Sequence, residues 1–197
     1  MKRALIVRGG WEGHEPMQVS EILGNALKEN GFQVEFSETL DVFTDKAKME
    51  NLDLIVPIWT MGHIEKDQLQ GLLSAVESGV GIAGVHGGMA DAFRDQPPYQ
   101  YMVGGQWVAH PGGDGVTYTV HIEDVPSPIT EGLSDFEVTS EHYYMHVDPG
   151  NTVLATTRFG DVVMPVTWIK RYGKGRVFYC SLGHVAKVFD IPEVLTM

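Results

Sequence analysis

Short apolar segments alternate with amphipathic ones through the first ninety residues of this 197-residue chain. Brief runs of apolar or alternating residues, bounded by glycines and polar turns, predict strands at 4–7, 32–36, 52–59 and 80–83. Apolar side chains recur at the spacing of one buried helix face at 16–30 and 65–78, which predicts helices there. The alternation predicts a parallel sheet with helices on both faces and a ligand site at the carboxyl ends of its strands.

The fourth predicted strand ends in Gly84-Val85-His86-Gly87-Gly88, and a helix is expected directly afterwards at 89–94. This G-x-H-G-G pattern is typical of a nucleophile elbow, a strained strand-to-helix turn that displays one side chain. Here the displayed group is an imidazole, which binds metals, moves protons or holds polar ligands. The elbow therefore argues against acyl transfer by a serine or cysteine. The single cysteine, Cys180, falls inside a predicted strand and is interpreted as a small buried residue rather than a reactive thiol.

The second half has a different pattern. Residues 99–115 are rich in glycine and aromatics, which predicts a long, ordered, functional loop. A turn with a short helical piece is expected at 125–133, and a helix at 191–197. Further strands are predicted at 116–122, 137–147, 153–157, 164–170 and 176–182. The last two flank Tyr172-Gly173-Lys174-Gly175, which is a hairpin signal.

The formal net charge of −12 disfavours binding to nucleic acid and to anionic membranes. No apolar run approaches the roughly 18 residues of a membrane span, and the amino terminus does not have the pattern of a signal peptide. A single cytoplasmic domain over residues 1–197 is expected, with one hydrophobic core.

Histidines gather where predicted strands end. His14, His63 and His86 follow such ends, His184 follows the last predicted strand, and His110 lies in the long loop. We expect at least two of them to meet in one pocket. Several imidazoles with one carboxylate suit zinc, and the metal ligands predicted on expected proximity are His86, His110 and His184.

The segment Ser140–Asp148 concentrates polar groups in a strand-like stretch. In a strand, Glu141 and Tyr143 share one face, where they offer a carboxylate and a phenol to a sugar or to metal-bound water. An exposed edge strand with a mixed face explains the same pattern. Trp11, Trp59 and Trp107 near strand ends could stack on a sugar ring, and core packing explains each of them equally well.

Five segments together resemble the ThuA-like (trehalose-utilisation) proteins: GGWEGH (9–14), GVHGGMADAFR (84–94), MVGGQWVAHP (102–111), SEHYYMHVD (140–148) and GKGRVFYCSLGH (173–184). The resemblance implies a flavodoxin-like, class I glutamine amidotransferase-like fold, a three-layer α/β/α sandwich without the amidotransferase cysteine. Its sheet would be mostly parallel, with antiparallel strands added in the C-terminal half. It also implies a terminal helix that continues past Met197.

The resemblance further implies a role in the metabolism of trehalose or a keto-disaccharide, with a functional link to a sugar dehydrogenase. Acid/base or metal-assisted isomerisation or hydrolysis of a sugar is the expected chemistry, without glutamine amidotransferase activity. A non-catalytic sugar-binding or regulatory module is the alternative, and a hydrolase using Cys180 ranks last. The expected cofactor is a divalent metal such as zinc, and a homo-oligomer is expected.

Each residue matched to the family pattern receives an expected role. The predicted catalytic residues are His86, Glu141 and His184. The predicted substrate contacts are His14, Trp11, Trp107, His110, Tyr143 and Asp91. One departure from the family pattern, Ser127-Pro128-Ile129 in place of a His-Pro-Ile, argues against a ligand at position 127.

Overall fold

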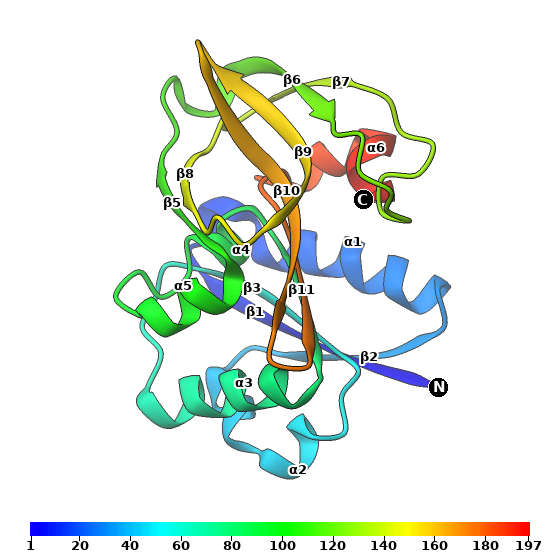
Figure 1. Ribbon diagram of the computed structural model, residues 1–197. Coiled ribbons are helices and arrows are strands. Elements are labelled where there is room, and N and C mark those ends of the chain that lie inside the picture. The colour runs from blue at the N-terminus through cyan, green and yellow to red at the C-terminus, as the bar shows by residue number, and fades with distance from the viewer.

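A computed structural model describes all 197 residues (Figure 1). Nine strands form one sheet in the order β2-β1-β3-β4-β11-β10-β9-β6-β7, and β5 and β8 form a separate two-stranded sheet. The strands are β1 (Lys2–Gly10), β2 (Phe32–Ser37), β3 (Leu54–Thr60), β4 (Gly81–Val85), β5 (Gly105–Ala109), β6 (Val116–Ile122), β7 (Phe136–Ser140), β8 (Tyr144–Val147), β9 (Thr152–Phe159), β10 (Val162–Tyr172) and β11 (Gly175–Cys180). The helices are α1 (Pro16–Glu29), α2 (Lys46–Met49), α3 (Lys66–Ser78), α4 (His86–Ala90), α5 (Pro97–Val103) and α6 (Pro192–Thr196), with short 3₁₀ turns η1 (Glu12–His14), η2 (Leu40–Thr44), η3 (Gly113–Gly115) and η4 (Ala186–Asp190).

The strands β1 to β4 pair in parallel, as the alternation of apolar segments predicts, and β11 from the second half adds a further parallel strand beside β4. Helix α1 covers one face of this part of the sheet, while α2 and α3 lie on the other (Figure 1). Leu5 and Ile6 are both fully buried but belong to two different core clusters. Adjacent strand residues point to opposite faces, so a strand covered on both faces is apolar throughout. The predicted three-layer α/β/α sandwich is confirmed.

Antiparallel strands extend the sheet from β11 through β10, β9, β6 and β7. The β9–β10 ribbon and β6–β7 rise above the parallel part of the sheet (Figure 1). The hairpin predicted around Gly173 is present, because β10 and β11 pair with Tyr172 opposite Gly175. No helix of the protein is long and apolar enough to cross a membrane.

The prediction of a continuous loop over 99–115 is wrong. Helix α5 begins at Pro97, whose missing N–H costs nothing in a first turn, and ends at Gly104, whose φ of 86° favours glycine. Strand β5 follows and pairs with β8, in the register Trp107 to Met145. Because that partner lies far along the chain, no local pattern announces the strand.

Three other boundaries differ from the prediction. The strand expected over 137–147 is split into β7 and β8, with residues 141–143 outside both strands. The helix expected at 89–94 begins at His86 and ends at Ala90. The segment 125–133 forms turns without a helix, since Pro126 and Pro128 lack the N–H groups that a helix needs.

Candidate functional site

Three histidines lie at the carboxyl ends of three strands of the parallel part of the sheet. His14 ends the η1 turn after β1, His86 begins α4 directly after β4, and His184 follows β11. All three are buried. The sheet order changes direction between β1 and β3, and open α/β sheets bind ligands at such a switch point. There the Nδ1 atom of His14 lies 2.9 Å from the Oγ1 atom of Thr60, the last residue of β3.

The backbone of the elbow is strained at His86, which adopts a left-handed φ of 47°. Its Nδ1 atom lies 2.7 Å from the carbonyl oxygen of Ser181, and its own carbonyl accepts a hydrogen bond from the Tyr179 hydroxyl at 3.1 Å. Since a carbonyl only accepts, Nδ1 carries the proton and Nε2 presents a lone pair to the site. The elbow needs glycine at position 87, because a Cβ there would lie 2.6 Å from the His14 ring.

Glu141 occupies the centre of the histidine cluster. One of its carboxylate oxygens, Oε2, lies 3.1 Å from His86 Nε2 and 3.8 Å from His14 Nε2. The other oxygen, Oε1, lies 3.6 Å from His184 Nε2 and 3.6 Å from His110 Nδ1. Glu141 reaches this position because the chain leaves the β7 strand just before it. One carboxylate therefore meets four imidazoles.

Burial sets the charge state of the cluster. It lowers the pKa of His86 to about 4, although the carboxylate of Glu141, which favours a protonated imidazole, acts in the opposite direction. Burial also lowers the pKa of His184. For Glu141, burial would raise the pKa, but its contacts with His14 and His86 outweigh burial and hold the pKa below the usual range. At neutral pH, a charged carboxylate thus faces the lone pair of a neutral His86.

The donor atoms of His14, His86, Glu141 and His184 all lie within 4.8 Å of one another. Two facing acceptors need a cation or a shared proton between them. In tetrahedral zinc sites with bonds of about 2.0–2.1 Å, neighbouring ligand atoms lie about 3.3–3.4 Å apart. Glu141 Oε2 lies 3.1 Å from His86 Nε2 and 3.8 Å from His14 Nε2, which brackets that spacing, and the other oxygen, Oε1, lies 3.6 Å from His184 Nε2. The contacts of Thr60 and Ser181 with the far ring nitrogens are those expected of groups that orient metal-bound histidines.

His110 stands apart from these four residues. It follows β5, its side chain is 37% exposed, and it approaches the cluster only at Glu141. Its Nδ1 atom is buried and has no hydrogen-bond partner. The sequence predicts His110 as a metal ligand and as a substrate contact; its partial exposure suits the second role better.

Aromatic rings form the walls of the site. Tyr143 stacks on His86 with ring centroids 3.8 Å apart, and Trp11 meets His14 edge-on at 4.8 Å while remaining 47% exposed. Trp107 lies 5.6 Å from His110 and 6.2 Å from Tyr143. Burial raises the pKa of Tyr143 well above its ordinary value, and the charges of Glu141 and Asp91 act in the same direction, so its phenol stays protonated.

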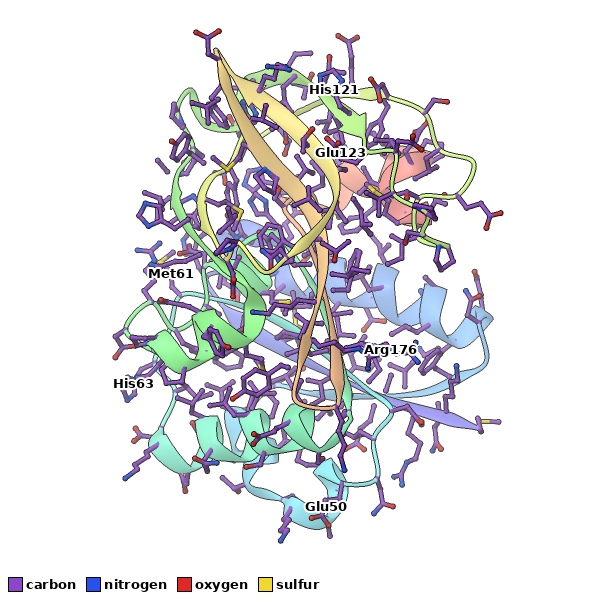
Figure 2. The ribbon with its side chains drawn as sticks, viewed as in Figure 1. Glu50, Met61, His63, His121, Glu123 and Arg176 are labelled. Carbon is purple, nitrogen blue, oxygen red and sulfur yellow. The ribbon has the colours of Figure 1, made fainter.

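Three residues noted in the sequence lie outside the site. His63 is exposed beside Glu65 and Asp95 (Figure 2). Trp59 packs against the larger core cluster. Cys180 is buried in the smaller core cluster, where the Thr167 hydroxyl donates to its sulfur at 3.3 Å, and burial raises the pKa of its thiol.

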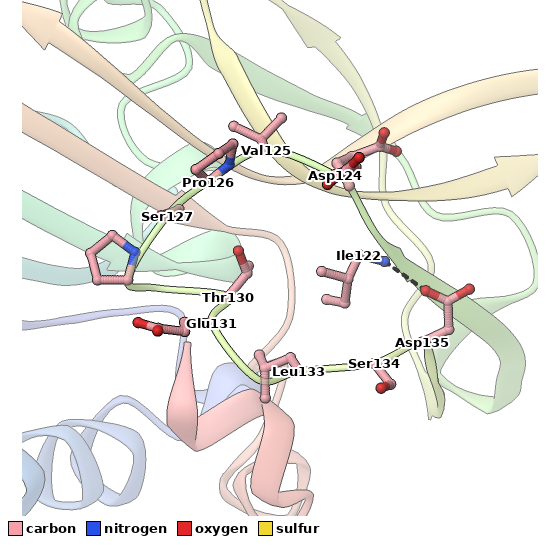
Figure 3. A pocket seen from close by; sticks show the side chains of 12 residues that line it. Ile122, Asp124, Val125, Pro126, Ser127, Thr130, Glu131, Leu133, Ser134 and Asp135 are labelled. Carbon is pink, nitrogen blue, oxygen red and sulfur yellow. Dashed lines mark hydrogen bonds between the residues drawn. The ribbon is translucent and has the colours of Figure 1, made fainter.

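A large hollow of the molecule lies away from the histidines. Its volume is about 860 Å³, and it lies inside the loop between Ile122 and Asp135, whose ends are joined by a 2.8 Å hydrogen bond (Figure 3). Ser127 lines this hollow rather than the histidine cluster. No histidine, lysine or arginine lines this hollow. The histidine cluster, and not the hollow, therefore has the side chains suited to binding a metal or moving a proton.

Sequence reasoning missed the groups that support the cluster. Thr60 and Ser181 touch histidines that are far from them in the chain. Glu15 adopts a left-handed φ of 46°, and its carboxylate accepts the N–H of Ala186 at 2.9 Å, which ties the His14 turn to the segment after His184. Only a preference for acidic residues beside strand-end histidines could have suggested Glu15, and nothing local identifies the other two.

Fold and site together define a class of protein: a three-layer α/β sandwich in which a strand-end elbow presents a histidine to a buried glutamate. The sequence profile of the ThuA family, described as trehalose utilisation, matches residues 3–197. The chain therefore belongs to the ThuA family. No curated protein matches the sequence.

Solved structures share the fold at low sequence identity. A ThuA-like protein from Bacteroides uniformis is 17% identical with a TM-score of 0.81, over 99% of this chain and 87% of that one. A ThuA-like protein from Parabacteroides merdae is 18% identical with a TM-score of 0.73, over 93% and 80% of the two chains. A cold-adapted β-galactosidase from Rahnella is 16% identical with a TM-score of 0.64, over 98% of this chain and 31% of its own. These likenesses concern the fold alone.

Proposed function

We propose that this protein is an enzyme of disaccharide metabolism that isomerises or hydrolyses a sugar, with a keto-disaccharide related to trehalose as its substrate. The observation that carries the proposal is the convergence of three buried histidines on one buried carboxylate, at the strand ends where such folds bind ligands. Membership of a trehalose-utilisation family supports the general role.

The donor set of His14, His86, His184 and Glu141 fits a divalent transition metal such as zinc, which would polarise a sugar carbonyl or activate a water. A set of three neutral imidazoles and one carboxylate leaves such an ion a single net positive charge. His86 and His14 are held in position by Ser181 and Thr60. The protein's own contribution is a rigid donor set with the correct tautomer at His86.

A keto group acidifies the C–H bond on the neighbouring carbon. His110, the partly exposed imidazole beside Glu141, would take that proton to form an enediolate and return it to the former carbonyl carbon, while the hydroxyl proton of the first carbon moves to the former carbonyl oxygen. The proton leaves one atom and returns to its neighbour, so the substrate is isomerised without net oxidation. Trp11 and Tyr143 would hold the sugar at the cluster through ring contact and the phenol.

Turnover of 3-keto-trehalose in D₂O, followed by NMR, tests this proposal. The wild-type protein should consume the sugar and incorporate deuterium at a ring carbon, and His86→Ala should abolish both while the fold survives. His63→Ala is the matched control, because that histidine is exposed and lies away from the cluster (Figure 2). If the wild-type protein binds the sugar but neither converts it nor exchanges its protons, it is a binding or regulatory module instead.

A further inference from the structure

Strain outside the histidine cluster marks a second functional element. Four residues other than glycine have left-handed φ values. Two of them, Glu15 and His86, belong to the cluster, whereas Met61 (58°) and Phe93 (48°) do not. Such strain persists only where the surroundings enforce it, and it gathers at functional sites. Met61 donates its N–H to Asp91 at 2.8 Å and accepts that of Phe93 at 3.1 Å, so the two strained residues fix the turn that carries Asp91 and Arg94.

This turn presents a rigid guanidinium. Arg94 donates from Nε and Nη2 to the two carboxylate oxygens of Asp91, at 2.6 and 2.9 Å. Asp91 is buried, while the Arg94 side chain remains 46% exposed. Its guanidinium carbon lies 4.7 Å from the centre of the Trp107 ring. The Nη1 atom makes no hydrogen bond within the protein, so a pre-positioned donor is left for a ligand.

The Arg94–Asp91 pair extends the site away from the histidine cluster. Trp107, beneath Arg94, is also the neighbour of His110 and Tyr143, and these two flank Glu141 and His86. The Tyr143 ring stacks on His86 and lies 6.2 Å from the Trp107 ring, so Tyr143 adjoins both the cluster and the ring that contacts Arg94. The row of side chains formed by Trp107, His110 and Tyr143 therefore has two ends, one at the histidine cluster and one at Arg94.

We propose that Arg94 and Trp107 form a second subsite that binds the non-reacting ring of a neutral disaccharide, with Arg94 as a specificity-determining residue. This rests on the proposed function, in which the histidine cluster acts on the first ring. Because Nε and Nη2 bind Asp91, the guanidinium fork has Nη1 and the second hydrogen of Nη2 left to contact two neighbouring oxygens, and sugar rings display vicinal hydroxyls. A monosaccharide would reach only the cluster end.

The ligand of this subsite is uncharged. Asp91 already neutralises Arg94, so the pair offers hydrogen-bond donors without a net positive charge. The chain carries a net charge of −12, which further disfavours a phosphate. A sugar phosphate would have to bury its charge beside a compensated arginine, and we expect the unphosphorylated sugar to bind better.

Calorimetric titration of the protein with trehalose, glucose and trehalose 6-phosphate tests the subsite. The wild-type protein should bind trehalose more tightly than glucose or trehalose 6-phosphate. Arg94→Gln should weaken trehalose binding about tenfold, which is the loss expected for a hydrogen bond from a charged donor, and change glucose binding less than twofold. Arg94→Lys keeps the charge that Asp91 requires, so it protects the fold, and it should show the same selective loss because it lacks the fork.

Arg176→Gln is the matched control, since Arg176 is exposed on β11 and lies away from Met61 (Figure 2). Equal losses for trehalose and glucose, or no loss in either Arg94 variant, would overturn the second subsite and leave the proposed function standing. If trehalose 6-phosphate binds more tightly than trehalose, the inference that the subsite takes an uncharged ligand is wrong. If the wild-type protein binds none of the three sugars, the second subsite is overturned, while turnover of 3-keto-trehalose decides the proposed function separately.

Discussion

The parallel and antiparallel parts of this protein contribute to the site in different ways. The parallel strands β1, β4 and β11 place His14, His86 and His184 at one edge of the sheet, each just past a strand end. The antiparallel strands supply the other groups: Trp107 lies in β5, His110 directly follows β5, and Glu141 and Tyr143 lie between β7 and β8. In the proposed function, the first part provides a rigid set of nitrogen donors, and the second provides the charge and the contacts with the substrate.

Removal of the central charge should have the largest effect. Glu141→Gln keeps the shape of the side chain but leaves three histidines of the parallel part without their carboxylate. We expect zinc affinity to fall more than about 100-fold, beyond the 10- to 100-fold range of supporting residues, and turnover to vanish. Zinc titration against a competing chelator measures this. Glu137→Gln, an exposed position on β7, is the control, and zinc binding unchanged in Glu141→Gln would show that the parallel part suffices.

The elbow should tolerate no added volume. In Gly87→Ala the new methyl group would lie 2.6 Å from the His14 ring, so one of the two must shift. We expect a loss of about 1–3 kcal/mol in the free energy of unfolding, as for overpacked cores, together with weaker metal binding. Urea denaturation measures the first effect. Gly115→Ala meets no atom within 4 Å and should change stability little; equal losses in the two variants would refute the close packing at the elbow.

The loss of the Thr60 hydroxyl, which orients His14, should have a smaller effect on zinc affinity than the loss of the Glu141 charge. Thr60→Val removes the hydroxyl that lies 2.9 Å from Nδ1 without changing the shape of the side chain much. We expect about a tenfold loss of zinc affinity, at the lower end for groups that orient metal-bound histidines. Thr117→Val, at an exposed strand position, is the control. A zinc affinity equal to that of the wild type would show that His14 needs no orienting partner.

The smallest effect concerns acid stability in the antiparallel part. His142 lies between the rings of Tyr118 and Phe159, and burial lowers its pKa to about 4. In the unfolded chain His142 binds a proton more tightly than in the folded protein. The contribution of neutral His142 to the free energy of unfolding is therefore complete above the ordinary pKa of about 6.5 and is lost as the pH falls toward 4. His142→Phe should reduce the loss of stability between pH 7.5 and 4.5 by on the order of 1 kcal/mol, measured by urea denaturation. An unchanged pH dependence would contradict a neutral, buried His142.

The two parts also differ in what could be predicted from sequence. The strands and helices of the first ninety residues follow from local apolar periodicity. His14 and His86 lie together past the ends of their strands, whereas His63, which the same pattern predicts beside them, is exposed outside the cluster. The exit of Glu141 from its strand and the pairing of β5 with β8 depend on partners far along the chain. Local patterns therefore predict one continuous strand over 137–147 and a loop over 99–115. Thr60, Ser181 and Arg94 gained their contacts only through the fold.

Metal content is the most direct test of the account. Tag-free protein, purified without added metal or chelator, should contain close to one transition-metal ion per chain by elemental mass spectrometry, and His86→Ala should contain almost none. A protein that holds no metal, even after incubation with zinc or manganese, would contradict the central claim that the histidines of the parallel strands and Glu141 form one cation site.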